Sequence, residues 1–383
     1  MLKYYKKKEL KRLVYKFILY FNIFLVILII LSQVSVHVSP AKFWPLAFIG
    51  LVYPYLLAAN ILMIVFWLFF RKKEFLISLI AILTGWNILS SLVQPNFRFL
   101  KKQEVREKYT RDYREKNRII KIMTFNVRAF NIYKWEKQKD ARDSIFRFIQ
   151  EEDPDIICFQ EYYTQERGLF AASRLFKSLK NTSFRHIYST IGENSNSQYG
   201  IATFSFYPVV GKGTIHFNNT FNTAIYTDIK INGDTVRVFN NHLQSVHLNS
   251  RHYTFLDSLS IRYNDQQLDE ILDISHRLKD AFIKRSKQAD IISGKIAEST
   301  YPVIVCGDFN DTPVSYAYKK IRSRLADSFI EAGWGIGNTY PGITPLLRID
   351  YILHNQTMNA IYTERIRLKL SDHYPLITYL QLD

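Results

Sequence analysis

The segment VIVCGDFNDTP, residues 303–313, brings a carboxylate and a carboxamide to the end of an apolar run. Four apolar residues lead into Gly-Asp-Phe-Asn, which predicts a buried strand with Asp308 and Asn310 at its tip. Carboxylate and amide oxygens bind hard divalent cations, and they also orient water for attack. The segment therefore predicts a polar site at one end of a buried strand.

Polar side chains of the same kinds adjoin the other apolar runs of the chain. These further candidates are Asn126, Glu161, His242, Asp350, Asp372 and His373. Taken singly, an Asp after a strand is more often a helix cap or a turn residue, and a lone His is more often a satisfied core residue. Taken together, the groups are of the types that bind a metal ion and move a proton, so the sequence predicts a metal-assisted catalytic site.

The elements that must position these groups begin near residue 119. Short β-rich runs such as IIKIMTFNV, DIICFQEYY and TVRVFNNHL alternate with two predicted helices, Asp140–Glu151 and Gln266–Ala297. Cys158 and Cys306 lie inside apolar runs, so we expect core thiols rather than a disulfide. Strands interleaved with helices over residues 119–383 predict a layered α/β or α+β domain with a large core.

Three apolar segments precede this domain. Phe17–Val38 contains no Asp, Glu, Lys or Arg and is long enough to cross a bilayer core of about 30 Å. Pro45–Phe70 and Phe75–Gln94 repeat the pattern on either side of a short basic loop. A cleavable signal peptide is the alternative for the first segment, but its apolar stretch is long and further spans follow it. We therefore predict a membrane anchor with three transmembrane helices in residues 1–97.

The net charge of +17 is concentrated around the predicted anchor. Residues 1–118 hold 20 Lys and Arg against 6 Asp and Glu, whereas residues 119–383 carry only +3. Residues 98–118 are polar and basic, and we interpret them as a juxtamembrane linker. Basic clusters at membrane flanks attract anionic headgroups. The predicted partners are therefore the lipid bilayer and a phosphate-bearing substrate; charge does not favour nucleic acid, and nothing indicates an obligate protein partner.

The distribution of basic residues also bears on orientation. Seven bases precede Phe17, and the loop Arg71-Lys72-Lys73-Glu74 follows the second span, which favours a cytoplasmic N-terminus. The basic residues after the third span oppose this orientation. Because long domains translocate despite their charge, we predict a multi-pass protein of the inner or plasma membrane with its catalytic domain outside the cytoplasm.

Six short motifs occur in order between Ile119 and Asp383, namely FNV, QE, NHL, GDFN, RIDYIL and SDHYP. In content and order they resemble the endonuclease/exonuclease/phosphatase family, the metal-dependent phosphoesterases related to pancreatic deoxyribonuclease. The resemblance implies a four-layer α/β sandwich, in which two packed mixed sheets are flanked by helices and the site lies at one end of the sheets. It also implies hydrolysis of a phosphate ester with Mg²⁺ or Mn²⁺.

The resemblance assigns roles to the candidates. Asn126, Glu161 and Asp372 correspond to the metal site. The catalytic candidates are His242, Asp308, Asn310, Asp350 and His373. Asp308 would orient or deprotonate the attacking water, Asp350 would pair with His373, and His242 would face the phosphate from the other side. The sequence leaves open which of His242, His373 and Asp308 handles each proton.

The chain also departs from the family pattern. Arg128 stands where some relatives have an acid, which puts a second metal in doubt; it would contact phosphate or lie in solvent. Phe206 replaces a basic residue that would contact phosphate. His247 and His252 fit no clear zinc spacing, so we interpret them as solvated loop residues.

Three functions remain open from the sequence. A phospholipid or another small phosphodiester or phosphomonoester is the first candidate substrate, because the predicted domain is nearly neutral and anchored. An outward-facing nuclease is the alternative. The third reading, an inactive membrane-attached binding module, gives no physical reason for retaining both a metal carboxylate and an Asp-His pair.

Overall fold

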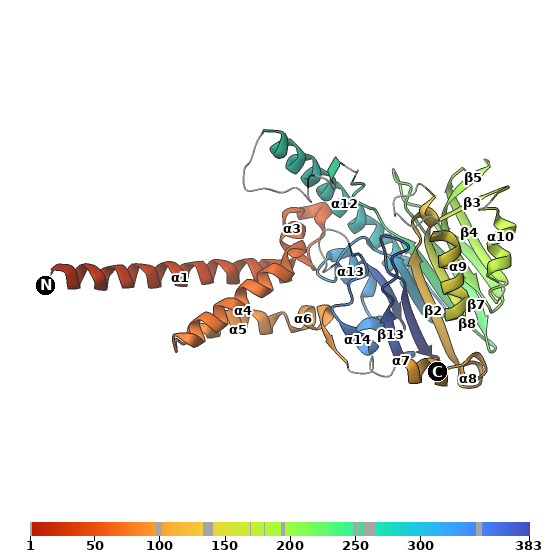
Figure 1. Ribbon diagram of the computed structural model, residues 1–383, viewed down its shortest axis with the longest axis horizontal. Helices are drawn as coiled ribbons and strands as arrows, with labels where there is room; N and C mark the ends of the chain where they lie inside the picture. Colours follow the sequence, from red (N-terminus) through yellow and green to blue (C-terminus); the bar gives the residue numbers. More distant parts are fainter. Residues whose placement is uncertain are drawn as a thin grey trace.

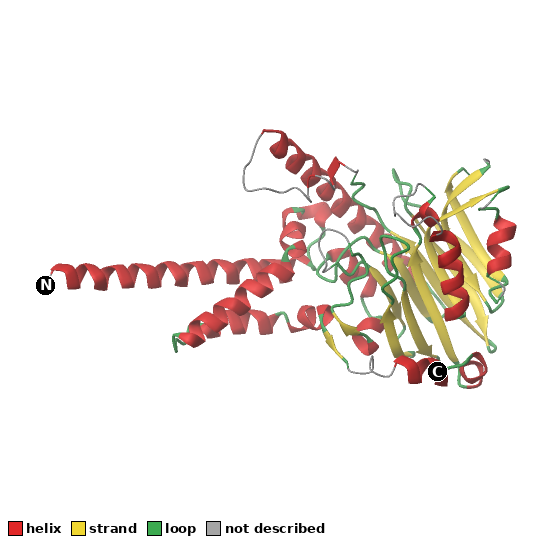
Figure 2. Cartoon of the chain, in the orientation of Figure 1, coloured by secondary structure: helices red, strands yellow, loops and turns green. Residues whose placement is uncertain are grey.

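Two six-stranded sheets packed face to face form the body of the molecule among the residues described (Figures 1 and 2). The computed structural model describes residues 2–96, 102–132, 141–168, 170–179, 181–192, 196–248, 251–252, 255, 265–341 and 347–383. The N-terminal helices project from one side of this body, and the C-terminus lies at one end of the sheets.

The first sheet has the strand order β10-β12-β9-β8-β7-β6. Its strands are β6 Val209–Ile215, β7 Thr223–Ile231, β8 Asp234–His242, β9 Val303–Asp308, β10 Ala326–Asp327 and β12 Asp350–His354. The second sheet has the order β13-β14-β2-β3-β5-β4. Its strands are β2 Ile119–Asn126, β3 Ile156–Gln165, β4 Phe184–Ile191, β5 Ser197–Ser205, β13 Asn359–Arg365 and β14 Leu376–Gln381. Each sheet is mixed, because β2/β3 and β8/β9 pair in parallel whereas the other pairs are antiparallel.

Helices cover the outer face of each sheet (Figure 1). On the second sheet lie α9 (Ala141–Glu152) and α10 (Ala172–Ser178), and on the first lie α12 (Asp265–Ala297) and α13 (Tyr316–Arg322). Apolar side chains from both sheets fill the space between them. The predicted α/β arrangement of two packed mixed sheets flanked by helices is therefore confirmed, and α9 and α12 match the two predicted helices to within one residue at each end.

Polar contacts also cross the gap between the sheets. The Gln160 side chain of β3 donates a hydrogen bond of 2.7 Å to the Asn240 side chain of β8. Asn240 in turn donates to the Ala202 carbonyl of β5 at 2.9 Å. Gln160 and Asn240 are fully buried, where an unpaired amide would be costly, so these bonds fix how one sheet lies on the other.

The cysteines are both free and buried, as the sequence predicts. Cys158 and Cys306 belong to the apolar layer between the sheets. They are therefore packing residues.

Six helices make up the N-terminal part. They are α1 Leu2–Ser35, α2 Pro40–Phe43, α3 Pro45–Leu51, α4 Tyr53–Phe69, α5 Phe75–Thr84 and α6 Trp86–Leu92. Only α1 is by itself long and apolar enough to cross a membrane among the residues described. The pairs α3/α4 and α5/α6 qualify only if each is one span, and they bend by 61° and 76°. The structure thus supports one of the three predicted spans, and the other two stay predictions.

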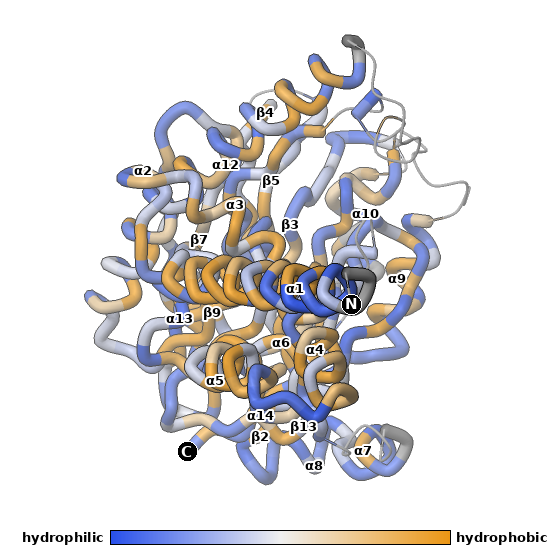
Figure 3. Tube along the Cα trace, turned by 90° about the vertical axis from the view of Figure 1, so that its left-hand side faces the viewer, coloured by the Kyte–Doolittle hydropathy of each residue, from blue (hydrophilic) through white to orange (hydrophobic). Residues whose placement is uncertain are grey.

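The apolar surface of these helices is extensive. Phe17, Leu62, Phe69 and Ile80 are each more than half exposed. Figure 3 shows α1, α4 and α5 from the side on which they project, mainly in the colour of hydrophobic residues. Side chains of this kind at the surface of a projecting helix bundle are typical of contact with lipid.

The N-terminal helices dock directly on the sheet domain. Val314, in the loop after β9, packs among the buried residues of the helix bundle. The rings of Phe48 and Phe282 lie 5.3 Å apart at an angle of 78°, which joins α3 to α12. The buried Arg348 guanidinium donates to the Ser91 carbonyl at 2.9 Å. Short strands β1 (Gln94–Pro95) and β11 (Trp334–Gly335) extend the contact.

The segment predicted as a linker also packs on the domain. It forms α7 (Lys102–Lys108) and α8 (Arg111–Lys116). Arg114 is 3% exposed and makes two hydrogen bonds of 3.0 and 3.1 Å to Asp155. Arg106 pairs with Glu152. At least these two basic groups therefore hold the segment to the domain.

A short helix, α14 (Ser328–Ala332), follows β10.

The docking contacts predict that the helix bundle stabilises the loop after β9. In a chain of residues 98–383, Val314 and Phe282 lose their apolar cover, which is worth about 1.5–3 kcal/mol for each side chain. We expect amide hydrogen exchange of residues 309–322 to be at least tenfold faster than in the full chain, as measured by mass spectrometry. Strands β2 and β3 serve as the internal control and should keep their protection. Equal exchange of residues 309–322 in the two chains would contradict the proposed support.

Candidate active site

The predicted site residues come from both sheets and meet at one end of them. Asn126 and His242 end β2 and β8, and Asp308 ends β9. Asp350 begins β12 directly opposite Asp308 in the antiparallel register. The C-terminal ends of β2, β8 and β9 therefore lie at the same end of the sheets as the N-terminal end of β12.

The Asn126 carboxamide joins the two sheets at this edge. Its nitrogen donates to Asp308 Oδ2 at 3.0 Å and to Glu161 Oε1 at 3.2 Å. Its oxygen accepts the backbone N–H of Arg128 at 3.1 Å. Asn126 is 1% exposed, so its amide is oriented by these bonds and holds a carboxylate from each sheet.

Glu161 enters the site through an irregularity in β3. The register shifts between Phe159 and Tyr162, and Glu161 has a φ of +52°, a left-handed conformation that is uncommon for residues other than glycine. Burial raises the pKa of Glu161, and Asp372 raises it further, although the Asn126 hydrogen bond opposes both. A local backbone distortion thus places a carboxylate where burial and a neighbouring acid disfavour its charge.

Tyr199 is a site residue that the sequence motifs did not reveal. Its hydroxyl hydrogen-bonds Glu161, and burial together with that carboxylate raises the pKa of Tyr199 far above its usual value. The phenol therefore stays neutral and acts as a donor. It stands on β5, in a run without a recognisable motif, so only the pairing of β5 with β3 brings it to the site.

Asp308 and Asn310 form a compact turn at the tip of β9. The Asn310 backbone N–H donates to Asp308 Oδ1 at 2.7 Å. The Asn310 amide donates to the Leu243 carbonyl at 3.0 Å, and its φ is +52°. Burial raises the pKa of Asp308 to about 6, while His373 and His242 oppose the shift. Asp308 is thus a buried carboxylate within reach of two imidazoles.

His373 pairs with Asp350, as the sequence predicts. Its Nδ1 lies 2.9 Å from Asp350 Oδ2, and its Nε2 lies 3.6 Å from Asp308 Oδ2. Burial by itself lowers the pKa of His373, but the Asp350 and Asp308 carboxylates raise it well above its usual value. The ring is therefore an imidazolium held between two carboxylates at neutral pH.

The pKa of His242 is shifted in the opposite direction to that of His373. Its Nε2 lies 3.8 Å from Glu161 Oε1 and 3.9 Å from Asp308 Oδ2, and it has no hydrogen-bond partner within the described part of the chain. Burial lowers the pKa of His242, although Asp308 opposes the shift. His242 is therefore a neutral imidazole whose buried nitrogen is free to meet a substrate.

The structure shows the contacts of the residues that depart from the family pattern. Arg128 lies against Asp372, with Nε 3.2 Å from Oδ2, rather than standing alone in solvent. Phe206 lies outside the site, under the Arg111 guanidinium at 4.3 Å from the ring centre. His252 is buried and 2.8 Å from Asp273, so its interpretation as a solvated residue is wrong, whereas His247 is exposed.

The oxygen ligands predicted for a cation are close to one another. The Asn126 amide nitrogen donates to Glu161. The Ser371 hydroxyl oxygen lies 2.8 Å from the Asn126 backbone carbonyl oxygen and 3.2 Å from Asp372 Oδ1. An oxygen-rich set of this kind suits Mg²⁺ or Mn²⁺ better than a soft metal. The Asp372 carboxylate raises the pKa of Glu161, and a bound cation would relieve this repulsion. The residues present therefore fit a hard divalent cation.

A second group with metal-binding potential adjoins the first. One ligand atom each from Asp308, Asp350 and His373 lies within 4.8 Å of the others. Because His373 already holds Asp350 through Nδ1, this group fits proton transfer as well as it fits a metal. The structure thus brings the candidate cation ligands close to the cluster of Asp308, Asp350 and His373.

Comparison with known proteins agrees with this geometry. The model of the Endonuclease/Exonuclease/phosphatase family matches residues 123–373, which is more than half of the chain. A domain of unknown function, DUF8431, matches residues 15–92. No curated protein matches the chain.

Solved structures share the fold. An endonuclease/exonuclease/phosphatase from Beutenbergia cavernae is 16% identical, with a TM-score of 0.51, over 69% of this chain and 72% of that one. A family protein from Bacteroides thetaiotaomicron is 16% identical, with a TM-score of 0.50, over 69% and 98%. The human Nocturnin catalytic domain with bound sulfate anion is 19% identical, with a TM-score of 0.45, over 69% and 94%. The likeness to the two bacterial structures shows the fold alone. The family match over residues 123–373 shows that the chain belongs to the endonuclease/exonuclease/phosphatase family, whose members hydrolyse phosphoester bonds.

Proposed function

We propose that the protein is a membrane-anchored, divalent-metal-dependent phosphoesterase that hydrolyses a phospholipid or another small phosphodiester or phosphomonoester. The observation that carries the proposal is the Asn126 amide, which bonds a carboxylate from each sheet beside the His373–Asp350 pair. This arrangement supplies a cation site and an acid-base cluster at one edge.

The mechanism follows from the state of each group. A bound divalent cation would polarise a phosphoryl oxygen and neutralise developing charge. Asp308, with a pKa of about 6, is ionised at pH 7 and accepts the proton of an attacking water, while Asn310 holds the Asp308 carboxylate in place.

The two histidines act on the phosphate in different ways. The His373 imidazolium faces the site through Nε2 and stabilises negative charge on a phosphoryl oxygen. Neutral His242 offers its unpartnered Nε2 as a hydrogen-bond donor or acceptor on the other side. We therefore assign the water proton to Asp308 and phosphoryl stabilisation to His373.

The anchor supports a substrate at the membrane surface. The loop that carries Asp308 and Asn310 continues to Val314, which packs among the N-terminal helices. The segment just before Asp350 contains Arg348, whose guanidinium donates to the Ser91 carbonyl of α6. Both catalytic loops are thus attached to the bundle, which keeps the site close to lipid headgroups and raises the local concentration of a membrane substrate.

The position of the basic residues supports an orientation. The Tyr15 hydroxyl bonds Glu74, and Lys72 lies over the Tyr15 ring at 5.9 Å, which places the Arg71–Glu74 loop beside the N-terminal part of α1. The basic N-terminus and the basic loop therefore share the end of the bundle away from Val314. By the positive-inside rule, that end is cytoplasmic and the sheet domain lies on the other side.

Metal dependence is the first test of this function. Hydrolysis of bis(p-nitrophenyl) phosphate by the full chain should vanish with EDTA and return with Mg²⁺ or Mn²⁺. Glu161→Gln should raise the Mg²⁺ concentration needed for half-maximal activity by about tenfold or more, since a ligand charge is lost. Glu166→Gln, a change of the same kind just after β3, is the matched control and should leave that concentration unchanged. Activity that survives exhaustive chelation would sink the assignment.

The role of Asp308 gives a second test. Asp308→Asn keeps the size of the side chain and an oxygen that accepts the Asn310 N–H, but it removes the proton acceptor. Turnover should fall by about 10²–10⁴, because the group that accepts the water proton is lost. Asp311→Asn in the same loop should instead lower stability, since it breaks the buried pair with Arg285 at 3.0 Å. Near-normal turnover of Asp308→Asn would show that another group accepts the proton.

Orientation is tested with reporters fused after Asp383. A reporter active only outside the cytoplasm should be active in this fusion, and one active only in the cytoplasm should be silent. A fusion after Lys73 should give the reverse pattern and serves as the control for membrane insertion. An active cytoplasmic reporter after Asp383 would place the substrate among intracellular phosphates.

A further inference from the structure

A cavity of about 470 Å³ adjoins the candidate active site. The residues that line it are Asn219, Thr220, Phe221, Gln244, His247 and Lys284. They come from the loop between β6 and β7, the segment after His242, and the middle of α12. A space of this volume is in the range that holds a small-molecule group.

The cavity and the catalytic centre share a wall. The Leu243 carbonyl accepts hydrogen bonds from Asn310 at 3.0 Å and from Asn222 at 2.9 Å. Asn310 belongs to the catalytic loop, and Asn222 follows the cavity residue Phe221. The Glu161 carboxylate raises the pKa of His247, so the cavity residue His247 also lies near Glu161. A substrate bound at the catalytic centre therefore extends into this cavity.

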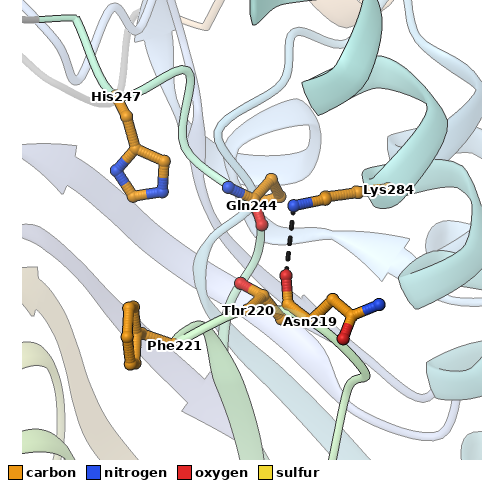
Figure 4. A pocket seen from close by; sticks show the side chains of 6 residues that line it. All are labelled: Asn219, Thr220, Phe221, Gln244, His247 and Lys284. Atoms are coloured by element: carbon orange, nitrogen blue, oxygen red, sulfur yellow. Dashed lines mark hydrogen bonds between the residues drawn. The ribbon is translucent and has the colours of Figure 1, made fainter.

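One positive charge faces the cavity without an opposing acid. The Lys284 ammonium donates to the Asn219 carbonyl at 3.1 Å, and no carboxylate is among the lining residues in the described chain. Figure 4 shows Lys284 and Asn219 on one side, the rings of His247 and Phe221 on the other, and Gln244 between them. An ammonium has three donors, so the remaining ones are available to an anionic group of a ligand.

Gln244 provides a second, independent sign of a ligand. It is only 4% exposed, and its side-chain oxygen has no hydrogen-bond partner among the described residues. Its backbone is held firmly, because its N–H donates to Gln288 at 2.9 Å and its carbonyl accepts from the buried Arg285 at 3.1 Å. A buried acceptor in a fixed position is costly to leave unpaired, and a ligand hydroxyl satisfies it.

Phe221 completes the chemistry of the cavity. It is 66% exposed, so its ring is available to cover the carbon skeleton of a bound group. A cation, a buried acceptor and an exposed ring thus line a single space. Their combination matches a hydroxylated carbon skeleton that carries an anion.

We propose that this cavity binds a second, unreacting phosphate and an adjacent hydroxyl group of the substrate, with Lys284 on the phosphate and Gln244 on the hydroxyl. The substrate is then a polyol phosphate with two phosphates, either soluble or as a lipid headgroup. The inference rests on the proposed function, because it treats the cavity as part of the same substrate site. The simpler role of Lys284, as a tether for the Asn219 loop, affects all ligands equally.

Binding measurements separate these roles. The full chain in detergent with Mg²⁺, in an Asp308→Asn background that prevents turnover, is titrated by calorimetry with fructose 1,6-bisphosphate and with fructose 6-phosphate. The bisphosphate should bind at least about tenfold more tightly, since a hydrogen bond between charged groups is worth about 1.5–3 kcal/mol. Lys284→Met should remove this preference, and Lys284→Arg should restore most of it. Lys287→Met, an equal charge change at an exposed position of α12, should leave it intact.

The source of the second phosphate is distinguished in the same experiment. Short-chain phosphatidylglycerol phosphate is titrated against phosphatidylglycerol; a larger Lys284-dependent preference than with the sugar pair identifies a lipid headgroup, and a smaller one identifies a soluble polyol. Equal affinity for one and two phosphates in both pairs, or a preference that survives Lys284→Met, would overturn the inference. Hydrolysis of bis(p-nitrophenyl) phosphate is measured separately with Asp308 intact. Lost hydrolysis with the binding preference retained rejects the proposed function and leaves the binding site.

Discussion

The close approach of carboxylates from two separate sheets is the constraint on which the site depends. Glu161 comes from one sheet and Asp308 from the other, and both have raised pKa values, because burial disfavours their charges. The Asn126 amide offers hydrogen bonds to both, and the His373 imidazolium lies beside Asp308. Such a cluster holds together only if the two sheets keep a fixed relation, because a shift of about 1 Å would break the bonds from Asn126.

The interior of the sandwich supplies that fixed relation. The bond from Gln160 to Asn240 spans the gap between the sheets just beneath the site, since Gln160 precedes Glu161 and Asn240 stands in the strand that ends at His242. Apolar packing between the sheets tolerates small sliding movements, whereas a buried amide pair has one satisfied geometry. The N-terminal helices add support from outside through Val314 and Arg348. The loops that carry the candidate site residues are therefore held both from the core and from the N-terminal helices.

The sequence predicted the layered fold, and it predicted the candidate site residues that the structure brings together, because both leave local patterns. Apolar runs that end in Asp308, His242 or Asn126 mark the tips of buried strands, and the motifs around them occur in a fixed order. Tyr199 escaped prediction because it reaches Glu161 only through the pairing of β5 with β3. The contact of Arg128 with Asp372 likewise depends on how two distant loops meet. The docking of α7 and α8 could not be predicted from composition, since a basic helix that packs on acidic partners has the same composition as a solvated linker.

The net charge of the domain likewise does not reveal where individual charges lie in the structure. The domain carries only +3 over residues 119–383, and this near balance argues against a broad surface for nucleic acid. Many of its charges cancel in pairs such as Arg348–Asp327 and Arg285–Asp311, which contribute little to the electrostatic field outside the domain. Lys284 lines a cavity that has no acid among its described lining residues, so a nearly neutral domain still presents a local positive charge near the candidate active site. Recognition of a small anionic substrate requires such a local arrangement rather than a high net charge.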